Sequence, residues 1–280
     1  MVDLKNLSFA YRKQKLFSGL NLHLDPGHIH GLLGKNGVGK TTLLKLISGL
    51  RYPQAGESIV LGFVPRERRP GMLEDLYLIP EEFSVPAISI RNYESMYTSF
   101  YPRFDRDALR DFEREFDLDR EKKLTELSYG QKKKFLLAFG LATNCRLLLL
   151  DEPTNGLDIP SKSQFRRVLA SALTEDRIII VSTHQVRDME NLIDNIIILE
   201  NGQIVFHRNM HDISMHLAFQ NEHELPGDDD VVYAEKVLGG NMVLRANRSG
   251  EESRIELETL FNAVIAEREK INGLFPGGAS

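Results

Sequence analysis

The chain has 280 residues, of which 42% are hydrophobic and 27% are charged, and its formal net charge is −5. This composition is typical of a globular protein with one large domain, or one large and one small, and it excludes the fibrous and wholly disordered classes. The acidic balance gives no sign of nucleic-acid binding, and the single cysteine, Cys145, excludes an intramolecular disulfide and a cysteine-based zinc site.

The sequence lacks the patterns of secreted and membrane-spanning segments. Residues 1–11 contain no basic stretch followed by a long apolar run, so we expect no secretion. The longest apolar runs, residues 147–150 and 178–181, are far shorter than the roughly 20 residues that a membrane-spanning helix needs. Any role at a membrane would therefore depend on another subunit.

The first part of the chain predicts an antiparallel sheet that leads into a buried strand. Residues 4–9 and 20–24 alternate apolar and polar side chains, as in a sheet with one face exposed. An Asp-Pro-Gly turn then leads to residues 28–33, an apolar strand that ends at a glycine-rich loop. Residues 41–47 have helical spacing, so the loop connects a strand to a helix.

The middle of the chain predicts a helical insertion in an α/β core. Between about residues 82 and 127 the strand patterns give way to polar helical segments, such as residues 105–116. Strands and helices then alternate, which indicates a mainly parallel sheet covered by helices. An Asn-Gly pair at residues 201–202 predicts a hairpin. The expected strands are residues 147–150, 178–181, 196–199 and 204–206, and the expected helices are residues 161–173 and 185–193.

Beyond residue 210 the pattern weakens, and Pro-Gly-Asp-Asp-Asp at residues 226–230 indicates a linker. Two strands and a helix are expected after the linker, and they contain no chemical motif. We therefore expect this C-terminal region to serve in packing or regulation. The expected elements are strands over residues 231–237 and 242–246 and a helix over residues 257–271. We therefore divide the chain into a large domain over residues 1–210, a linker over residues 211–230 and a small accessory region over residues 231–280.

A phosphate-binding loop follows the buried strand. Residues 34–41, GKNGVGKT, fit the pattern G-x-x-x-x-G-K-[ST] between a strand and a helix. The glycines let backbone amides converge on phosphate oxygens, and the helix adds the positive end of its dipole. We expect Lys40 to reach the β- and γ-phosphates and the Thr41 hydroxyl to ligate Mg²⁺. The predicted nucleotide site comprises Gly34, Asn36, Gly37, Gly39, Lys40, Thr41 and Thr42.

A pair of carboxylates follows four consecutive leucines. Asp151 and Glu152 stand at the carboxyl end of this predicted strand, the edge at which open α/β sheets bind ligands. Asp151 is expected to hold Mg²⁺ through water, since this ion prefers oxygen ligands and keeps part of its hydration shell. Glu152 points elsewhere from Asp151 and is the better candidate to polarise the attacking water. Two adjacent acids alone would more often be ordinary surface residues. The apolar run before them and the phosphate loop upstream favour a catalytic role instead.

Three further motifs give the chain a resemblance to a known family. LSYGQ at residues 127–131, DEPTNGLD at residues 151–158 and Ser-Thr-His at residues 182–184 occur in the order of an ABC-type ATPase domain, which the chain resembles over residues 1–210. The resemblance implies an α/β fold: a P-loop NTPase core with a mainly parallel sheet, an antiparallel β subdomain, and a helical signature subdomain over about residues 82–135. A small α+β appendage would follow at the C-terminal end.

The same resemblance implies Mg²⁺-dependent hydrolysis of ATP to ADP and phosphate at a site completed by a second subunit. Lys40, Glu152 and His184 would be catalytic, with His184 as the switch histidine that contacts the γ-phosphate. Tyr11 would stack on adenine. The signature residues Ser128, Gly130 and Gln131 would contact the ATP held by the other subunit, and Asp158 would end the loop that crosses the dimer interface.

Two positions depart from the family pattern. Tyr129 stands where glycine is commonest, yet Ser128 and Gly130 remain, so we expect a working signature. Glu81 stands where a glutamine usually links magnesium to the transporter interface. A carboxylate can ligate magnesium but cannot donate an amide hydrogen bond. Similar proline-glutamate sequences occur in ATPases of export-type transporters, which favours export, although Glu81 could instead be an ordinary surface acid.

The leading hypothesis is the cytoplasmic energy-coupling subunit of an ABC transporter. It would form a homodimer around two ATP molecules, lie on the inner face of the cell membrane, and drive separate membrane-spanning permease subunits that dock on residues 83–120. A soluble ABC ATPase of translation or DNA metabolism is the alternative. One ATPase domain, the short interval between Lys40 and Ser128 and the single cysteine count against it. A regulatory ATPase whose C-terminal region binds a partner is a third possibility.

Overall fold

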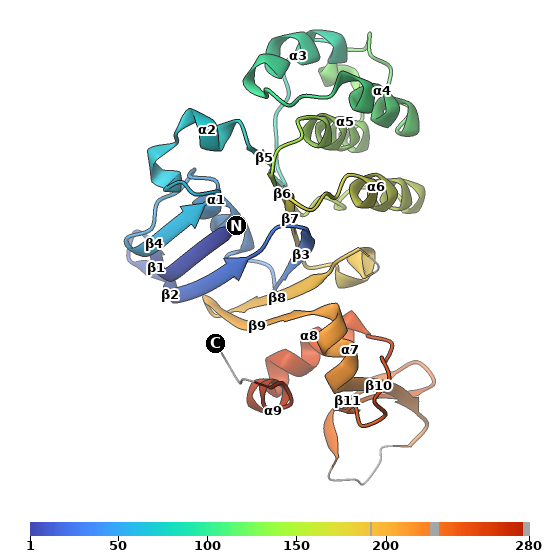
Figure 1. The fold of residues 1–280 in the computed structure, drawn as a ribbon. Helices are drawn as coiled ribbons and strands as arrows, with labels where there is room; N and C mark the ends of the chain where they lie inside the picture. The colour runs from blue at the N-terminus through green and yellow to red at the C-terminus, as the bar shows by residue number, and fades with distance from the viewer. Residues whose placement is uncertain (191, 225–229, 277–280) are drawn as a thin grey trace.

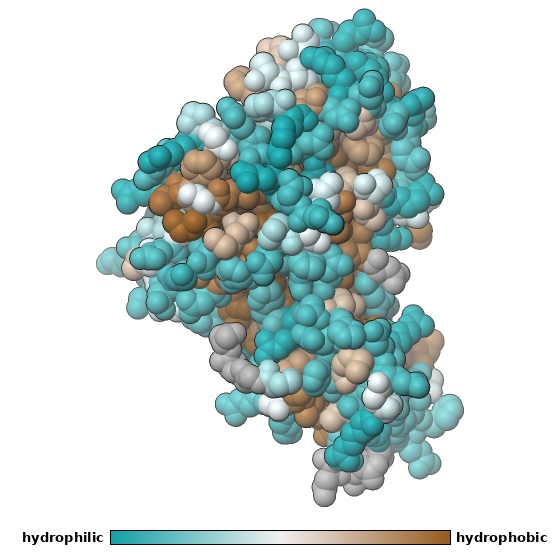
Figure 2. Space-filling model, in the orientation of Figure 1, coloured by the Kyte–Doolittle hydropathy of each residue, from teal (hydrophilic) through white to brown (hydrophobic). Residues whose placement is uncertain are grey.

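The computed structural model describes residues 1–190, 192–224 and 230–276 (Figure 1). Its strands form three sheets with the orders β2-β1-β4, β5-β6-β7-β3-β8-β9 and β10-β12-β11. Hydrophilic residues cover most of the face drawn in Figure 2, and a hydrophobic area lies over the region of α1 and β4. Within the described ranges no helix is long and apolar enough to cross a membrane.

The first sheet is antiparallel, as the alternation of its residues predicts. It is built from β1 (Val2–Tyr11), β2 (Gln14–Leu24) and β4 (Ala55–Val60). Helix α1 (Lys40–Ile47) lies beneath it, and Leu20 of the sheet, Leu43 of the helix and Leu149 of the central sheet belong to one buried cluster. This shared apolar core fixes the start of α1 between the two sheets.

The central sheet is mainly parallel, which confirms the expected core. Its parallel strands are β5 (Leu76–Ile79), β6 (Leu147–Asp151), β7 (Ile178–Thr183), β3 (His28–Leu33) and β8 (Asn195–Glu200). The antiparallel strand β9 (Gln203–Asn209) follows through the predicted hairpin, where Asn201 and Gly202 have φ angles of 48° and 74°. Both angles are left-handed, the conformation that a two-residue hairpin turn requires.

The helical region lies at one end of the molecule (Figure 1). It contains α3 (Ile90–Tyr97), α4 (Arg106–Glu115) and α5 (Tyr129–Ala142), and α6 (Ile159–Ser171) packs beside α5. Short elements lie between the longer ones. The 3₁₀ segment η1 (Pro65–Glu67) and α2 (Pro70–Leu73) lie between β4 and β5, and the 3₁₀ segments η2 (Thr98–Phe100) and η3 (Leu124–Glu126) follow α3 and precede α5, respectively.

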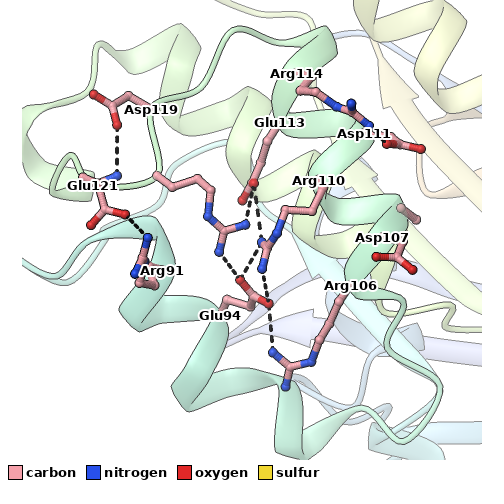
Figure 3. A network of polar contacts seen from close by, with 12 residues as sticks. Arg91, Glu94, Arg106, Asp107, Arg110, Asp111, Glu113, Arg114, Asp119 and Glu121 are labelled. Carbon is pink, nitrogen blue, oxygen red and sulfur yellow. Dashed lines mark hydrogen bonds and ion pairs between the residues drawn. The ribbon is translucent and has the colours of Figure 1, made fainter.

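Two buried acids hold the polar helices of this region together (Figure 3). Glu94 of α3 accepts hydrogen bonds from Arg106 and Arg110 of α4 and from Arg120. Glu113 accepts one from Arg120 at 2.9 Å, and burial raises the pKa of Glu113 to about 7. Charge-assisted bonds to buried carboxylates thus add to the apolar packing of these helices, in which Ile90 and Leu109 belong to the main core cluster.

In the C-terminal part, helices and strands begin closer to residue 210 than predicted. Helix α7 (Met210–His216) and strand β10 (Leu217–Glu222) occupy the first half of the expected linker, and residues 226–229 lie outside the described residues. β10 completes a sheet with the two predicted strands because β12 offers it an edge. The remaining elements are β11 (Val231–Val237), β12 (Gly240–Ala246), α8 (Leu257–Ala266) and α9 (Arg268–Gly273). The division of the chain into domains stays a prediction.

One predicted helix is wrong. Residues 185–193 form only the 3₁₀ segment η4 (Val186–Met189), and residue 191 lies outside the described residues. Val186, Met189 and Ile193 have the spacing of one helix face and are all buried in the main core cluster, so the apolar pattern reports their burial and not a continuous helix. Ile193 also fills the space above Gly31, where an added Cβ would stand 2.5 Å from Ile193 Cδ1.

Candidate functional site

The phosphate loop connects β3 to α1 as expected. Gly37 and Gly39 have φ angles of 79° and 117°, a backbone conformation that L side chains rarely adopt. A Cβ at Gly39 would also stand 2.9 Å from Phe17 of β2. The glycines therefore permit a tight turn that brings the backbone amides to the N-terminus of α1.

The side chains at the start of α1 face the end of β6. Lys40 is buried, and its Nζ atom donates to the Gly34 carbonyl at 2.7 Å and lies 3.2 Å from Oε1 of Glu152. The Thr41 hydroxyl donates to Oδ2 of Asp151 at 2.7 Å. The structure thus brings together the loop and the carboxylate pair, which are more than a hundred residues apart in the sequence.

Glu152 is held in a constrained position. It is 4% exposed, and its φ angle of 46° is in the left-handed region, which is uncommon for a residue other than glycine. His184 lies next to it, with Nδ1 2.9 Å from Oε1 of Glu152 and its backbone N–H donating to Oε2 at 3.3 Å. A strained backbone at a residue with a reactive side chain points to a functional role, and this one lies between a lysine and a histidine.

Tyr11 closes one side of the same cavity. It ends β1 and is paired with Gln14 across the hairpin, and its hydroxyl is hydrogen-bonded to Oγ1 of Thr42 at 3.2 Å. That bond lowers the pKa of Tyr11. The cavity has a volume of about 430 Å³ and is lined by Tyr11, Gln14, Leu16, Asn36, Gly37, Gly39, Lys40, Thr41, Thr42, Glu81, Glu152 and His184.

The remaining predicted residues lie elsewhere. Gly34 and Asp151 do not line the cavity, but they are hydrogen-bonded to Lys40 and Thr41, respectively, which do. The signature residues do not line the cavity. Ser128 is the N-cap of α5: its hydroxyl accepts from the Gln131 N–H at 3.2 Å, and Oε1 of Gln131 accepts from the Ser128 N–H at 3.0 Å.

Gly130 and Asp158 also lie outside the cavity, close to the signature loop. A Cβ at Gly130 would stand 3.5 Å from Leu157, which immediately precedes Asp158. Asp158 is the N-cap of α6, and hydrogen bonds from Ser161 lower its pKa. The signature loop and the loop that ends at Asp158 therefore form one surface.

Several residues around the site were not predicted from the sequence. Gln14 and Leu16 line the cavity because the β1–β2 hairpin places them beside Tyr11. Ser182 holds the carboxylate pair in place: its hydroxyl donates to Oδ1 of Asp151 at 2.5 Å, and the Glu152 N–H donates to its carbonyl at 3.0 Å. Ser182 could have been identified from the sequence, because it directly precedes Thr183 and His184 at the end of the strand next to β6.

Comparisons with known proteins agree with this geometry. The family model described as "ABC transporter" matches residues 17–155. The Nod factor export ATP-binding protein I of Rhizobium etli is 30% identical over 236 residues, which cover 81% of this chain and 74% of that protein. The ABC transporter ATP-binding protein YtrB of Bacillus subtilis is 28% identical, with 73% of this chain and 70% of that protein covered.

Solved structures share the fold. An ATP-binding subunit of an ABC transporter superposes with a TM-score of 0.71 at 24% identity, over 76% of this chain and 91% of that one. A dimeric ATP-binding cassette in a post-hydrolysis state, bound to ADP and Pi, gives a TM-score of 0.66 at 22% identity, over 75% and 98%. The predicted fold class and the resemblance are confirmed. The chain therefore belongs to the ABC transporter ATP-binding proteins, which bind ATP and hydrolyse it to ADP and phosphate.

Proposed function

We propose that this ATPase is the energy-coupling subunit of an ABC exporter and works as a homodimer with two composite ATP sites. The observation that carries the proposal is the separation of two phosphate-binding surfaces in one chain. Lys40 and Glu152 line the cavity, whereas Ser128 and Gly130 lie outside it. Two copies related by a two-fold axis can bring each signature surface to the other copy's cavity, which gives two equivalent sites.

The residues present fit a magnesium ion bound together with ATP. The Thr41 hydroxyl and Oδ2 of Asp151 are 2.7 Å apart, and Thr41 and Glu81 both line the cavity. All three residues offer oxygen, the donor atom that Mg²⁺ prefers. Thr41, Asp151 and Glu81 would hold the ion. Magnesium, when bound, would neutralise charge on the phosphate oxygens.

Four side chains of the cavity bind ATP or transfer the proton. Tyr11 stacks on the adenine ring at the cavity entrance, and Lys40 donates to the β- and γ-phosphates. Glu152 accepts a proton from the attacking water, and His184 keeps its carboxylate oriented and contacts the γ-phosphate. The short contacts of Glu152 to Lys40 and His184, 3.2 Å and 2.9 Å, support this assignment because they already orient the carboxylate towards the cavity.

The signature surface supplies donors to the ATP of the other subunit. The first backbone N–H groups of a helix have no partner within the helix, and the helix dipole makes this end positive. Helix α5 has 14 residues, and its N-terminus starts at Tyr129, directly after Ser128. Ser128, Gly130 and Gln131 thus stand where an anion would bind. Asp158 closes the neighbouring loop across the interface.

A groove between the helical region and the central sheet suits permease subunits. It has a volume of about 750 Å³ and is lined mainly by apolar and aromatic side chains, among them Tyr77, Pro80, Phe83, Tyr97 and Phe100. Phe100 is 62% exposed, an uncovered apolar ring that a partner helix could bury. Docking here would hold the subunit at the inner face of the membrane, next to Glu81. Export is favoured by Glu81 and by the export role in the name of the Rhizobium etli relative.

Mixing two inactive variants tests the composite site. Lys40→Ala removes the phosphate loop's charge, and Ser128→Arg blocks the signature surface, so each homodimer should be inactive. A mixed dimer has one site with both defects and one with neither. Full exchange should restore at most about one quarter of the parental ATPase rate, because half of the dimers would carry one intact site of two. If the mixture stays inactive under conditions in which subunits exchange, the composite homodimer is wrong.

A further inference from the structure

Tyr129 connects three segments that are far apart in the sequence. Its hydroxyl donates to the Glu81 carbonyl at 2.8 Å. Its ring stacks on Phe83, with centroids 5.3 Å apart and an interplanar angle of 14°. A Cβ at Gly156 would stand 3.1 Å from the ring, so the ring lies directly over that backbone. The residue that departs from the usual signature therefore contacts both the Glu81 segment and the loop after Glu152.

Lys133 extends this connection one turn along α5. It is 4% exposed, and its Nζ atom donates to the carbonyls of Glu152 at 2.8 Å and Asn155 at 2.7 Å. The ammonium group also lies 5.3 Å from the centroid of the Tyr129 ring, within range of a cation–π interaction. Residues four apart share a helix face, so Tyr129 and Lys133 move with α5 as one unit.

Asn155 connects the Glu81 segment to the segment that follows His184. Its Nδ2 atom donates to Oε1 of Glu81 at 3.0 Å, and its Oδ1 atom accepts from Nε2 of Gln185 at 3.1 Å. Gln185 directly follows His184. A displacement at the start of α5 would therefore act on Glu81, on the backbone of Glu152 and on the segment that carries His184, all of which border the cavity.

We propose that Tyr129 and Lys133 are positioning residues that couple the signature surface of a subunit to the Glu81 and Glu152 segments of that same subunit. The inference rests on the proposed composite dimer. The signature surface of one subunit contacts the ATP of the other subunit, so occupancy of one site changes the placement of the carboxylates at the second site. A glycine at position 129 would have no side chain to reach Glu81 or Phe83, which makes the hydroxyl contact a property of this chain. The coupling is carried by packed and hydrogen-bonded contacts.

Cooperativity of ATP hydrolysis tests the coupling. The rate is measured against ATP concentration for the parent and for Tyr129→Phe, which removes the hydroxyl contact and keeps the ring. Coupled sites give the parent a Hill coefficient of about two, and loss of coupling lowers it to about one. Lys133→Met should have the same effect, whereas Lys133→Arg retains a donor and should retain cooperativity. Lys132→Met, on the neighbouring residue, is the matched control and should behave as the parent.

The outcomes separate this inference from the proposed function. Thermal unfolding identifies any variant that fails to fold, and Glu152→Gln with ATP tests dimer formation by light scattering. If ATP drives dimerisation but Tyr129→Phe and Lys133→Met keep the parental Hill coefficient, the coupling is wrong and the composite dimer stands. A parental coefficient of one would likewise overturn the coupling. If ATP produces no dimer, the proposed function itself fails.

Discussion

Nδ1 of His184 lies 2.9 Å from Oε1 of Glu152. The same carboxylate oxygen is 3.2 Å from Nζ of Lys40. One oxygen of Glu152 thus lies between the two side chains that we expect to contact the γ-phosphate of ATP. Because that phosphate would compete for the ammonium group of Lys40, binding of ATP would free the carboxylate oxygen from the lysine, while His184 keeps the carboxylate oriented towards the attacking water.

Replacement of Glu152 by glutamine should separate binding from hydrolysis. The amide keeps the shape of the side chain but cannot accept the proton, so we expect the turnover rate to fall by about 10²- to 10⁴-fold. ATP affinity should stay close to the parental value. Phosphate release and equilibrium binding of radiolabelled ATP measure the two quantities. Hydrolysis at the parental rate would exclude Glu152 as the general base.

Removal of the Tyr11 ring should weaken nucleotide binding through lost stacking. Stacking of a base on an aromatic side chain is worth about 1–3 kcal/mol, so Tyr11→Ala should raise the dissociation constant for ATP by about 5- to 150-fold. Tyr11→Phe loses the hydroxyl and its contact with Thr42 but keeps the ring, and it should bind nearly as the parent does. Inorganic triphosphate, which has no base, is the control ligand. Equal losses of affinity for ATP and triphosphate would contradict the stacking role.

Activity should decline at alkaline pH through Lys133. Burial lowers its pKa to about 8, against the opposing effect of the Glu81, Glu152 and Asp151 carboxylates. Above that pH the folded protein loses the charge that strengthens the bonds to Glu152 and Asn155. The unfolded chain holds the proton up to about pH 10.4, so this group makes folding more favourable as pH rises from about 8 to that value.

The alkaline loss of ATPase activity should therefore occur without loss of stability. Rates and urea unfolding curves measured between pH 7 and pH 10 test both parts. Lys133→Arg keeps its charge over this range and should move the decline to higher pH. An unchanged pH profile in Lys133→Arg would show that another group causes the decline.

Cys145 should be inert in the folded protein. The thiol is buried, and burial raises its pKa to about 12, so the reactive thiolate is scarce at neutral pH. We expect iodoacetamide to label the chain slowly in buffer and rapidly in denaturing urea, as mass spectrometry would show. Equally fast labelling in both conditions would mean that the residue is accessible.

The C-terminal helices should contribute to the stability of the whole chain. Leu260 of α8 is fully buried and belongs to the same apolar cluster as Leu150 of β6. Leu260→Ala should lower the free energy of unfolding by about 2–5 kcal/mol, as other large-to-small core substitutions do. Leu238, with a relative exposure of 103%, is the matched control, and Leu238→Ala should change little. Urea unfolding followed by circular dichroism measures both. A parental stability in Leu260→Ala would show that α8 packs independently of the core.

The sequence predicted the central sheet well because its strands are long apolar runs with clear ends. Strand β5 was not predicted from the sequence. It has only four residues, too few to show a clear apolar alternation, and it forms a strand because it pairs with β6. Strand β10, which lies within residues 211–230, was not predicted for the same reason: Phe219 pairs with Leu244, a partner distant in sequence.

The cavity was more predictable than the contacts that connect it to the rest of the chain. Lys40, Thr41 and Glu152 occur in motifs whose spacing reflects phosphate chemistry, and the cavity gathers them. The bonds from Lys133 to the carbonyls of Glu152 and Asn155 depend on how α5 packs against that loop, and spacing in the sequence does not encode this packing.

The positive φ angle of Glu152 sets a local strain against the contacts of its side chain. Glycine would occupy this left-handed position with less strain, so glutamate has a local cost in stability of about 1 kcal/mol or more. The contacts of the carboxylate with Lys40 and His184 oppose that cost. Glu152→Gly would therefore relax the backbone and at the same time leave the buried ammonium group of Lys40 without its carboxylate partner.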